Sequence, residues 1–208
     1  MKISIIGSGH IGGTLARLFV KAGHEVALAN SRGPDSLKTF VDELGPQLLP
    51  VKNIEEAIVF SDLIIFSIHW RTIDSLPVFN AQGKIIVDTT NPYKSDGTFY
   101  DLGDDIPSTK VMKHFTGGVI VKAFNTIWFQ HLAENGNTDL PIAERRVIPV
   151  ASDDSGAKSK VSGLIEEIGF GPFDSGSLKA GTALQNIQGL LYNKELTVQE
   201  ATDIVRRL

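Results

Sequence analysis

The sequence predicts an α/β fold, with a doubly wound, mostly parallel sheet followed by a small C-terminal α/β cap. Three observations favour this class. Short apolar runs alternate with segments of helical periodicity through the first half of the chain. The first apolar run is joined to the first helical segment by a glycine-rich turn, Gly7-Ser8-Gly9-His10-Ile11-Gly12. With 208 residues, the chain is long enough for one large domain and a small second one.

The elements of the first half follow from apolar spacing and from the residues that end each run. Buried strands are expected at residues 2–6, 25–29, 48–51, 63–68, 84–87 and 119–123. Helices are expected at residues 11–22, closed by Gly23, and at residues 36–44, closed by Gly45-Pro46. Asn53 is expected to cap a further short helix. Residues 91–107, which are rich in Asp, Gly and Pro, are predicted to form a long loop.

The second half is less regular. Strands are expected at residues 146–151 and 170–173, with a helix at residues 154–168 between them. Another helical face is predicted from Leu184, Ile187 and Leu191. Thr197-x-x-Glu200 is a capping-box pattern and predicts a last helix. Its inward residues are expected to be Val198, Ala201, Ile204, Val205 and Leu208. The polar stretch at residues 134–139 divides a domain of residues 1–135 from one of residues 136–208.

Composition excludes several classes of protein. The formal net charge is −4 and the pI is near 5.7, so no general nucleic-acid or anionic-membrane binder is expected. The absence of cysteine excludes disulfides, thiol catalysis and Cys-based metal sites, and no metal site is predicted. The apolar runs are too short for a membrane span, and the first residues do not resemble a signal peptide. We expect a cytoplasmic protein, and a homodimer is left open.

The glycine-rich turn predicts a dinucleotide site. Its pattern, G-x-G-x-x-G, follows a buried strand and opens an amphipathic helix, which is the context that gives the motif meaning. Gly7 would make the tight turn, Gly9 would let the backbone approach a pyrophosphate, and Gly12 would let the helix pack near the strand. A tight strand–helix turn without a ligand is the alternative. The sequence therefore predicts a Rossmann-type domain that binds its cofactor at Gly7, Ser8, Gly9, His10, Ile11 and Gly12.

The end of the second strand favours NADP(H) over NAD(H). An NAD site places an acidic residue there, about 20 residues past the loop, to hold the ribose 2′-hydroxyl. This chain has Asn30-Ser31-Arg32 instead, and these three residues are predicted to bind the cofactor. A hydroxyl and a guanidinium would bind a 2′-phosphate through charge-assisted hydrogen bonds, and Lys38 could add charge. The alternative is an ordinary polar turn.

The ends of the later strands supply the other candidate residues, because ligands of open α/β sheets bind outside the carboxyl ends of the strands. We expect Trp70 to wall the nicotinamide or a planar substrate, and Thr90, Asn91 and Asn125 to hydrogen-bond ribose or carboxamide. A capped turn is the alternative for the Thr-Thr-Asn-Pro segment. The candidates at these strand ends are Ser67, Ile68, His69, Trp70, Thr90, Asn91, Pro92, Phe124, Asn125 and Thr126.

The catalytic residue is left open. His69 is a candidate proton donor because imidazole titrates near neutral pH, and an uninvolved loop histidine is the alternative. No Tyr-x-x-x-Lys pair of the short-chain dehydrogenase type is present, since no tyrosine has a lysine four residues on. Hydride transfer between two bound partners needs proximity and orientation rather than a strong acid or base.

Several segments together resemble the NADP oxidoreductases of the coenzyme F-420-dependent type, and the cytosolic domain of the six-transmembrane metalloreductases is similar too. The resemblance implies an N-terminal NADP(H)-binding domain and a small C-terminal domain that closes a cleft. It would place Ser31 and Arg32 at the 2′-phosphate, and Ile68, His69 and Trp70 along the nicotinamide cleft. The segments that carry it are residues 6–13, Gly23-His24-Glu25-Val26, Asn30-Ser31-Arg32-Gly33-Pro34, residues 87–92, residues 121–126, Gly169-Phe170 and Gly176-Ser177-Leu178.

We therefore expect an NADP(H)-dependent oxidoreductase that transfers hydride between NADPH and a small-molecule redox acceptor. The acceptor is expected to be a flavin, a deazaflavin or a small carbonyl, in that order. Family members that use a deazaflavin usually carry Pro before the Trp that follows the fourth strand, where this chain has His69. A non-catalytic NADP(H)-binding redox sensor is the alternative, and an imine reductase with a helical dimerisation domain is a third hypothesis.

Overall fold

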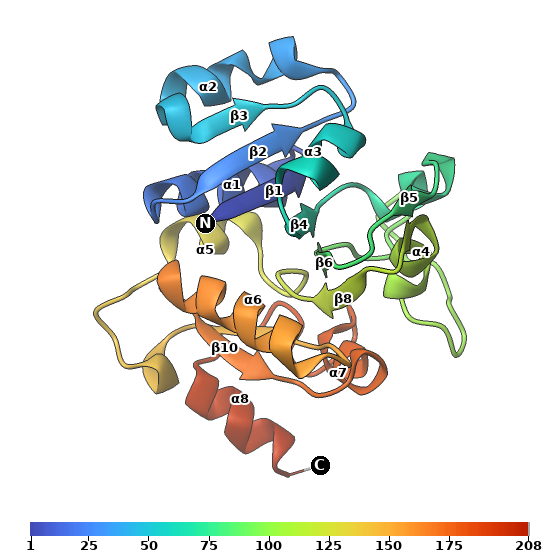
Figure 1. Cartoon of the computed structure of the whole chain (residues 1–208). Helices are drawn as coiled ribbons and strands as arrows, with labels where there is room; N and C mark the ends of the chain where they lie inside the picture. Colours follow the sequence, from blue (N-terminus) through green and yellow to red (C-terminus); the bar gives the residue numbers. More distant parts are fainter. Residues whose placement is uncertain (208) are drawn as a thin grey trace. The chain divides into compact units, whose positions relative to one another are not determined.

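The structure is a computed structural model that describes residues 1–207. By its internal contacts the chain divides into two compact units, residues 1–120 and the remainder from Val121 (Figure 1). The boundary predicted from the sequence, between residues 135 and 136, falls later in the chain and stays a prediction. Each unit is described separately below.

The first unit is built around a mostly parallel sheet. Its strands lie in the order β3-β2-β1-β4-β6-β8, and the measured registers between β3 and β6 are all parallel. The chain starts in the middle, runs to one edge through β2 and β3, and returns to the other side of β1 with β4, which is the doubly wound arrangement. The predicted fold class is confirmed. The strands are β1 (Lys2–Ile6), β2 (Glu25–Ala29), β3 (Leu48–Pro50), β4 (Leu63–Phe66), β6 (Ile85–Asp88) and β8 (Val119–Lys122), and β8 contains the division between the units.

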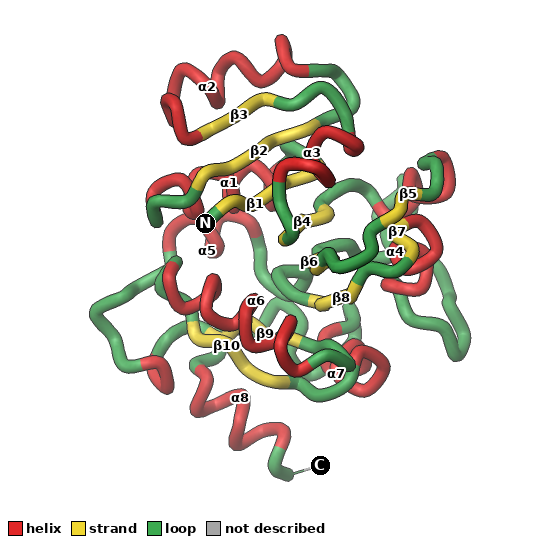
Figure 2. Tube along the Cα trace, viewed as in Figure 1, coloured by secondary structure: helices red, strands yellow, loops and turns green. Residues whose placement is uncertain are grey.

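Helices connect the strands as the apolar spacing predicts. In Figures 1 and 2, α3 (Ile54–Phe60) lies in front of β1 and β2, and α1 (His10–Lys21) lies behind them. The apolar face of α1 buries Leu15 and Phe19 completely, and the helix stops before Gly23, whose φ is +88°. The helix predicted at residues 36–44 is split into a 3₁₀ helix, Pro34–Leu37, and α2, Lys38–Leu44. The predicted cap of α3 is confirmed, because the Asn53 side chain accepts a hydrogen bond from Glu56 N.

The sequence missed the short elements of this unit. Two-residue strands β5 (Phe79–Asn80) and β7 (Phe115–Thr116) pair in parallel, and a 3₁₀ helix covers Trp70–Ser75. Helix α4 (Ser108–His114) follows the predicted long loop and buries only Ser108 and Val111. Elements this short and this polar carry no readable periodicity, so their existence depends on tertiary contacts.

The second unit contains a two-stranded parallel sheet, β9 (Val147–Val150) with β10 (Gly171–Asp174), joined by α6 (Ser155–Glu167). The predicted α/β character of this part is confirmed. The capping box is also confirmed at α8 (Val198–Val205), where Thr197 and Glu200 bond reciprocally. The helical face through Leu184, Ile187 and Leu191 is wrong, because α7 (Leu178–Gln185) ends at Gln185 and Asn186 is extended. Helix α5 (Phe129–Glu134) was not predicted, and Leu208 lies outside the described residues.

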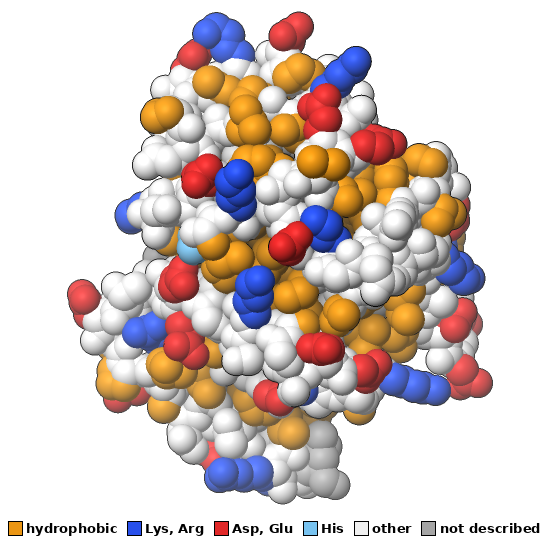
Figure 3. All heavy atoms as spheres, in the orientation of Figure 1, with side chains coloured by type: hydrophobic (Ala, Val, Ile, Leu, Met, Phe, Trp, Pro, Cys, Tyr) orange, Lys and Arg blue, Asp and Glu red, His pale blue; other side chains and the backbone are white. Residues whose placement is uncertain are grey.

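Two surface properties follow from this arrangement. Basic and acidic side chains are interspersed on the face drawn in Figure 3, in keeping with the small net charge. Among the helices of residues 1–207, none has both the length and the apolar character that a membrane crossing requires.

Candidate functional site

The three glycines of the motif differ in whether the surrounding backbone leaves room for a side chain. Gly7 leaves β1 at a φ of +109°, and a Cβ atom there would lie 2.0 Å from the carbonyl oxygen of Ser67. A Cβ atom at Gly12 would lie 1.9 Å from the carbonyl oxygen of Gly7. Gly9 has a φ of −75°, which any residue adopts, and a Cβ atom there would meet nothing within 4 Å. The local fold therefore requires glycine at positions 7 and 12, but not at position 9.

The glycine loop leads into the N-terminus of α1 with no competing anion of its own. Gly9 is the N-cap residue, no side chain caps the helix, and the first turn contains no acidic residue. The backbone N–H groups of such a helix start, together with the helix dipole, attract a phosphate group. The geometry of the loop thus fits a pyrophosphate, and the open space at Gly9 is where a backbone could be approached closely.

Backbone hydrogen bonds bring the ends of four strands of the first unit to one edge. Gly7 N donates to Ala29 O at 2.8 Å, Ser67 N donates to Ile6 O at 2.8 Å, and Thr89 N donates to Phe66 O at 3.2 Å. Each residue that follows a strand is thereby held beside the end of its neighbour. Along this edge the predicted segments therefore follow the strand order: segment 30–32, the glycine loop, segment 67–69 and segment 90–92.

At the end of β2, Asn30 and Arg32 differ in how they are engaged. The Asn30 carboxamide is held by hydrogen bonds to Ser8, Arg32 and Ser36. The Arg32 side chain is exposed and makes no hydrogen bond, ion pair or ring contact within residues 1–207. Lys38, which could have added charge, bonds to Asp42 one turn further along α2 at 3.0 Å. Arg32 is therefore the cation at this strand end that is available to an anion.

The predicted site residues that follow β4 differ in how far they are exposed to solvent. Ser67 and Ile68 are half-buried beside Gly7, and His69 is exposed. The carbonyl oxygen of His69 accepts hydrogen bonds from the N–H and the hydroxyl of Thr72, which starts the 3₁₀ helix. The role of the His69 ring as a proton donor stays a prediction.

The Trp70 side chain is buried and packs inside the first unit. Only 5% of its surface is exposed, and its indole N–H donates to Pro107 O at 3.0 Å. The Lys110 ammonium lies 3.8 Å from the centre of the indole ring, and the Tyr100 ring centre lies 5.0 Å away. The ring thus ties the 3₁₀ helix after β4 to the loop of residues 91–107 and to α4. Its predicted place beside the nicotinamide stays a prediction.

The segment after β6 is shaped by a buried carboxylate that the sequence reasoning missed. Asp88 is fully buried, and its Oδ1 accepts hydrogen bonds from the backbone N–H and the hydroxyl of Thr90 at 2.8 and 2.7 Å. Its Oδ2 accepts from the hydroxyl of Ser108 at 2.6 Å. Thr90 is thus part of a capped turn, while Asn91 is half-buried and Pro92 is buried. An Asp at the end of an apolar run, followed by Thr-Thr, was the available signal.

In the second unit, the predicted residues Phe124, Asn125 and Thr126 are all buried. Phe124 has a φ of +63°, a left-handed conformation that is costly for a bulky side chain and is often retained at functional sites. Asn125 Nδ2 donates to Gln185 O at 3.1 Å, and Asn193 N donates to Thr126 O at 2.9 Å. These bonds hold the three residues in place within their own unit.

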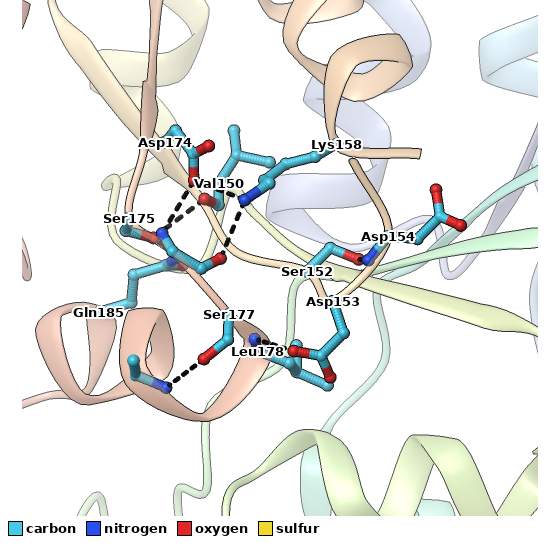
Figure 4. A network of polar contacts seen from close by, with 12 residues as sticks. Val150, Ser152, Asp153, Asp154, Lys158, Asp174, Ser175, Ser177, Leu178 and Gln185 are labelled. Atoms are coloured by element: carbon cyan, nitrogen blue, oxygen red, sulfur yellow. Dashed lines mark hydrogen bonds and ion pairs between the residues drawn. The ribbon is translucent and has the colours of Figure 1, made fainter. Parts of the chain in front are cut away.

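The Gln185 side chain extends this arrangement, as Figure 4 shows. Its Nε2 donates to Ser175 Oγ at 2.9 Å, and Ser175 in turn donates to Val150 O at 3.0 Å. Nearby, Lys158 bonds to Asp174 and to Gly176 O, while Asp153 accepts from Leu178 N at the start of α7. Sequence reasoning missed Gln185 and Ser175, since nothing in the pattern of isolated polar residues distinguished them.

Two carboxyl groups in the chain have lowered pKa values, and both lie outside the predicted site residues. The pKa of Glu43 is lowered chiefly by a hydrogen bond from Arg17, and the pKa of Asp96 is lowered chiefly by the hydroxyl of Thr98. Over residues 1–207, no cluster of three or more His, Asp or Glu side chains could hold a metal ion. What the strand-end edge offers chemically is anion binding and a shaped surface.

Comparison with known proteins agrees with this geometry. Residues 2–92 match the family described as NADP oxidoreductase, coenzyme F420-dependent. The chain is 30% identical over 192 residues to metalloreductase STEAP3 of Rattus norvegicus, covering 89% of this chain and 36% of that protein. It therefore spans about a third of the length of this curated relative.

Solved structures show the same fold. A hypothetical protein from Sinorhizobium meliloti superposes with a TM-score of 0.82 at 29% identity, covering 95% of both chains. A proposed F420-dependent NADP reductase from Arthrobacter sp. FB24 superposes with a TM-score of 0.69 at 23% identity, covering 85% of both chains. The predicted resemblance to this family is confirmed over residues 2–92.

Proposed function

We propose, from the family of F420-dependent NADP oxidoreductases to which residues 2–92 belong, that this chain binds NADP(H) and reduces a small-molecule acceptor. The acceptor is a flavin, a deazaflavin or a small carbonyl, in that order. The predicted cytoplasmic location and homodimer stay predictions.

The observation that carries the proposal is the contrast among the motif glycines. Gly7 and Gly12 are explained by backbone atoms about 2 Å from where a side chain would begin, whereas none of residues 1–207 lies close enough to explain Gly9. A bound pyrophosphate explains it, because glycine alone lets a phosphate approach the backbone this closely.

The residues of the strand-end edge divide the work of binding. The backbone of residues 7–12 and the start of α1 hold the pyrophosphate, and Ser31 and Arg32 hold the 2′-phosphate. Ser67, Ile68 and Asn91 are proposed for the nicotinamide half. When bound, the nicotinamide ring supplies or accepts a hydride. The chain itself then needs to orient two partners and exclude water rather than supply a strong acid or base.

Titration calorimetry of the purified protein with NADPH and NADH tests the cofactor. A charge-assisted contact is worth about 1.5–3 kcal/mol, so NADPH should bind at least about tenfold more tightly. Equal dissociation constants, or binding of neither dinucleotide, would exclude NADP(H) as the cofactor.

The redox-sensor alternative is favoured by the absence of a clear acid–base residue at the edge. Steady-state oxidation of NADPH with a panel of flavins, a deazaflavin and small carbonyls separates the two hypotheses. Turnover with one acceptor class supports the oxidoreductase and identifies that class. Tight NADPH binding without turnover for any acceptor supports the sensor.

A further inference from the structure

Asn30 is the polar centre of the turn after β2. Its Nδ2 donates to Ser8 Oγ in the glycine loop and to Ser36 Oγ, both at 2.9 Å. Its Oδ1 accepts from the backbone N–H of Arg32 at 2.9 Å. The backbone N–H can only donate, so it fixes which end of the carboxamide faces Arg32.

Ser36 links Asn30 to Gly33 through its hydroxyl group. Its hydroxyl has one proton, and its shortest acceptor is Gly33 O at 2.7 Å, so the hydroxyl accepts from Asn30 and donates to Gly33. Gly33 has a φ of +82° and precedes the 3₁₀ helix that contains Ser36. Asn30 and Ser36 thus hold the turn of residues 31–33 at both of its ends.

Both amide protons of Asn30 are donated within the chain, so its side chain has no donor left for the cofactor. The carboxamide also suits this place better than the carboxylate of an NAD-type site. An aspartate could not donate to Ser8, and its negative charge would oppose a 2′-phosphate beside Arg32. The value of Asn30 for cofactor choice is therefore indirect.

We propose that Asn30 and Ser36 are positioning residues for recognition of the 2′-phosphate. They hold the backbone of Arg32 in one conformation and tie it, through Ser8, to the loop that binds the pyrophosphate. Arg32, whose guanidinium has no partner in residues 1–207, is thereby presented at a fixed distance from the rest of the dinucleotide. This inference rests on the proposed NADP(H) function and adds which residues determine the preference for NADP(H) over NAD(H).

A double-mutant cycle read by calorimetry tests the proposal, with NADP⁺, NAD⁺ and adenosine 2′,5′-bisphosphate as ligands. Asn30→Ala should weaken NADP⁺ and the bisphosphate about tenfold and leave NAD⁺ within about threefold. In an Arg32→Ala background, adding Asn30→Ala should change NADP⁺ affinity less than about twofold, because the positioned group is absent. Ser36→Ala should reproduce a smaller loss of NADP⁺ preference, and Ser36→Thr should restore it.

Asn53→Ala is the matched control, since Asn53 also forms a side-chain bond to a backbone N–H, at the start of α3. It should leave the ratio of the two affinities unchanged. Equal weakening of NADP⁺ and NAD⁺ by Asn30→Ala, or an equal effect with and without Arg32, would overturn the positioning role. If Asn30→Ala does not fold, Ser36→Ala and Ser36→Thr decide the same question. If the unaltered protein shows no NADP⁺ preference, the proposed cofactor itself fails.

Discussion

Alanine substitutions at Gly12 and Gly9 distinguish a glycine that the fold requires, Gly12, from one proposed to be required by the ligand, Gly9. In Gly12→Ala the added carbon would lie 1.9 Å from the carbonyl oxygen of Gly7. Gly12 itself lies within α1. Alanine favours a helix over glycine by about 1 kcal/mol, but overpacking against backbone costs about 1–3 kcal/mol, so the clash decides the sign.

We therefore expect Gly12→Ala to lower the free energy of unfolding by up to about 2 kcal/mol, measured by urea denaturation. Gly9→Ala should leave it within about 0.5 kcal/mol, because nothing lies within 4 Å of the new carbon. Gly9→Val should abolish NADPH binding while the protein stays folded. A folded Gly9→Val variant with intact NADPH affinity would contradict the dinucleotide site.

Arg32 carries the cofactor prediction at the same scale. Arg32→Ala should weaken NADPH at least about tenfold, since a charge-assisted bond is lost, and should leave NADH nearly unchanged. Lys38→Ala is the control, because Lys38 is paired with Asp42. Calorimetry of the three proteins with both dinucleotides measures the difference, and a similar loss for NADH in Arg32→Ala would point to misfolding of the turn.

Helices α1 and α2 are joined by one well-formed ion pair. Arg17 Nε and Nη2 each donate to Glu43 at 2.7 Å, and the guanidinium lies 4.5 Å from the centre of the Phe40 ring. The hydrogen bond from Arg17 lowers the pKa of Glu43 below its ordinary 4.5. A lowered pKa in the folded state means that the pair stabilises the protein above the unfolded pKa and ceases to do so as pH falls through the folded pKa.

The stability difference between the unaltered protein and Glu43→Gln should therefore be present at pH 7 and vanish as pH falls below about 4.5. Both side chains are 42% exposed, so we expect a difference of about 0.5 kcal/mol at low salt. Urea denaturation at several pH values measures it. A difference that does not shrink as pH falls below 4.5 would contradict the assignment.

Trp70 links the elements around the loop of residues 91–107. Because its ring is buried and packs against both Lys110 and Tyr100, Trp70→Ala should cost about 3–5 kcal/mol of stability, while Trp70→Phe should cost much less. Trp128→Ala is the control, since Trp128 is 52% exposed and should change stability little. Denaturation gives the stabilities. If Trp70→Ala leaves stability intact but stops turnover with planar acceptors, the ring serves the cofactor rather than the packing.

For the molecule as a whole, ligand binding should appear as thermal stabilisation. NADPH at 100 times its dissociation constant should add about 2.7 kcal/mol, which is about 5–10 °C for a chain of this length. NADH at the same concentration should raise the melting temperature by about half as much if it binds tenfold more weakly. Equal shifts for the two dinucleotides, measured by calorimetry or intrinsic fluorescence, would contradict the predicted preference.

The sequence by itself determined the sheet strands, α1 and the glycine loop. Their signals are local: runs of branched apolar residues, one apolar stripe at helical spacing, and glycines at fixed offsets. The doubly wound arrangement then followed from the limited ways in which βαβ units can be wound. The same local chemistry of Ser31 and Arg32 pointed to a 2′-phosphate.

Only the tertiary structure decided the parts that depend on distant partners. The fully buried Asp88 meets Ser108 from the other end of a long loop, and Trp70 finds Pro107 and Lys110. Asn30 is predicted to contact the cofactor, which stays a prediction, and the structure adds that its Nδ2 donates to Ser8 and Ser36. Distant partners also determine two further features, the pairing of β5 with β7 and the end of α7 at Gln185. In each case the free energy comes from contacts between segments far apart in the chain, and no local pattern records such contacts.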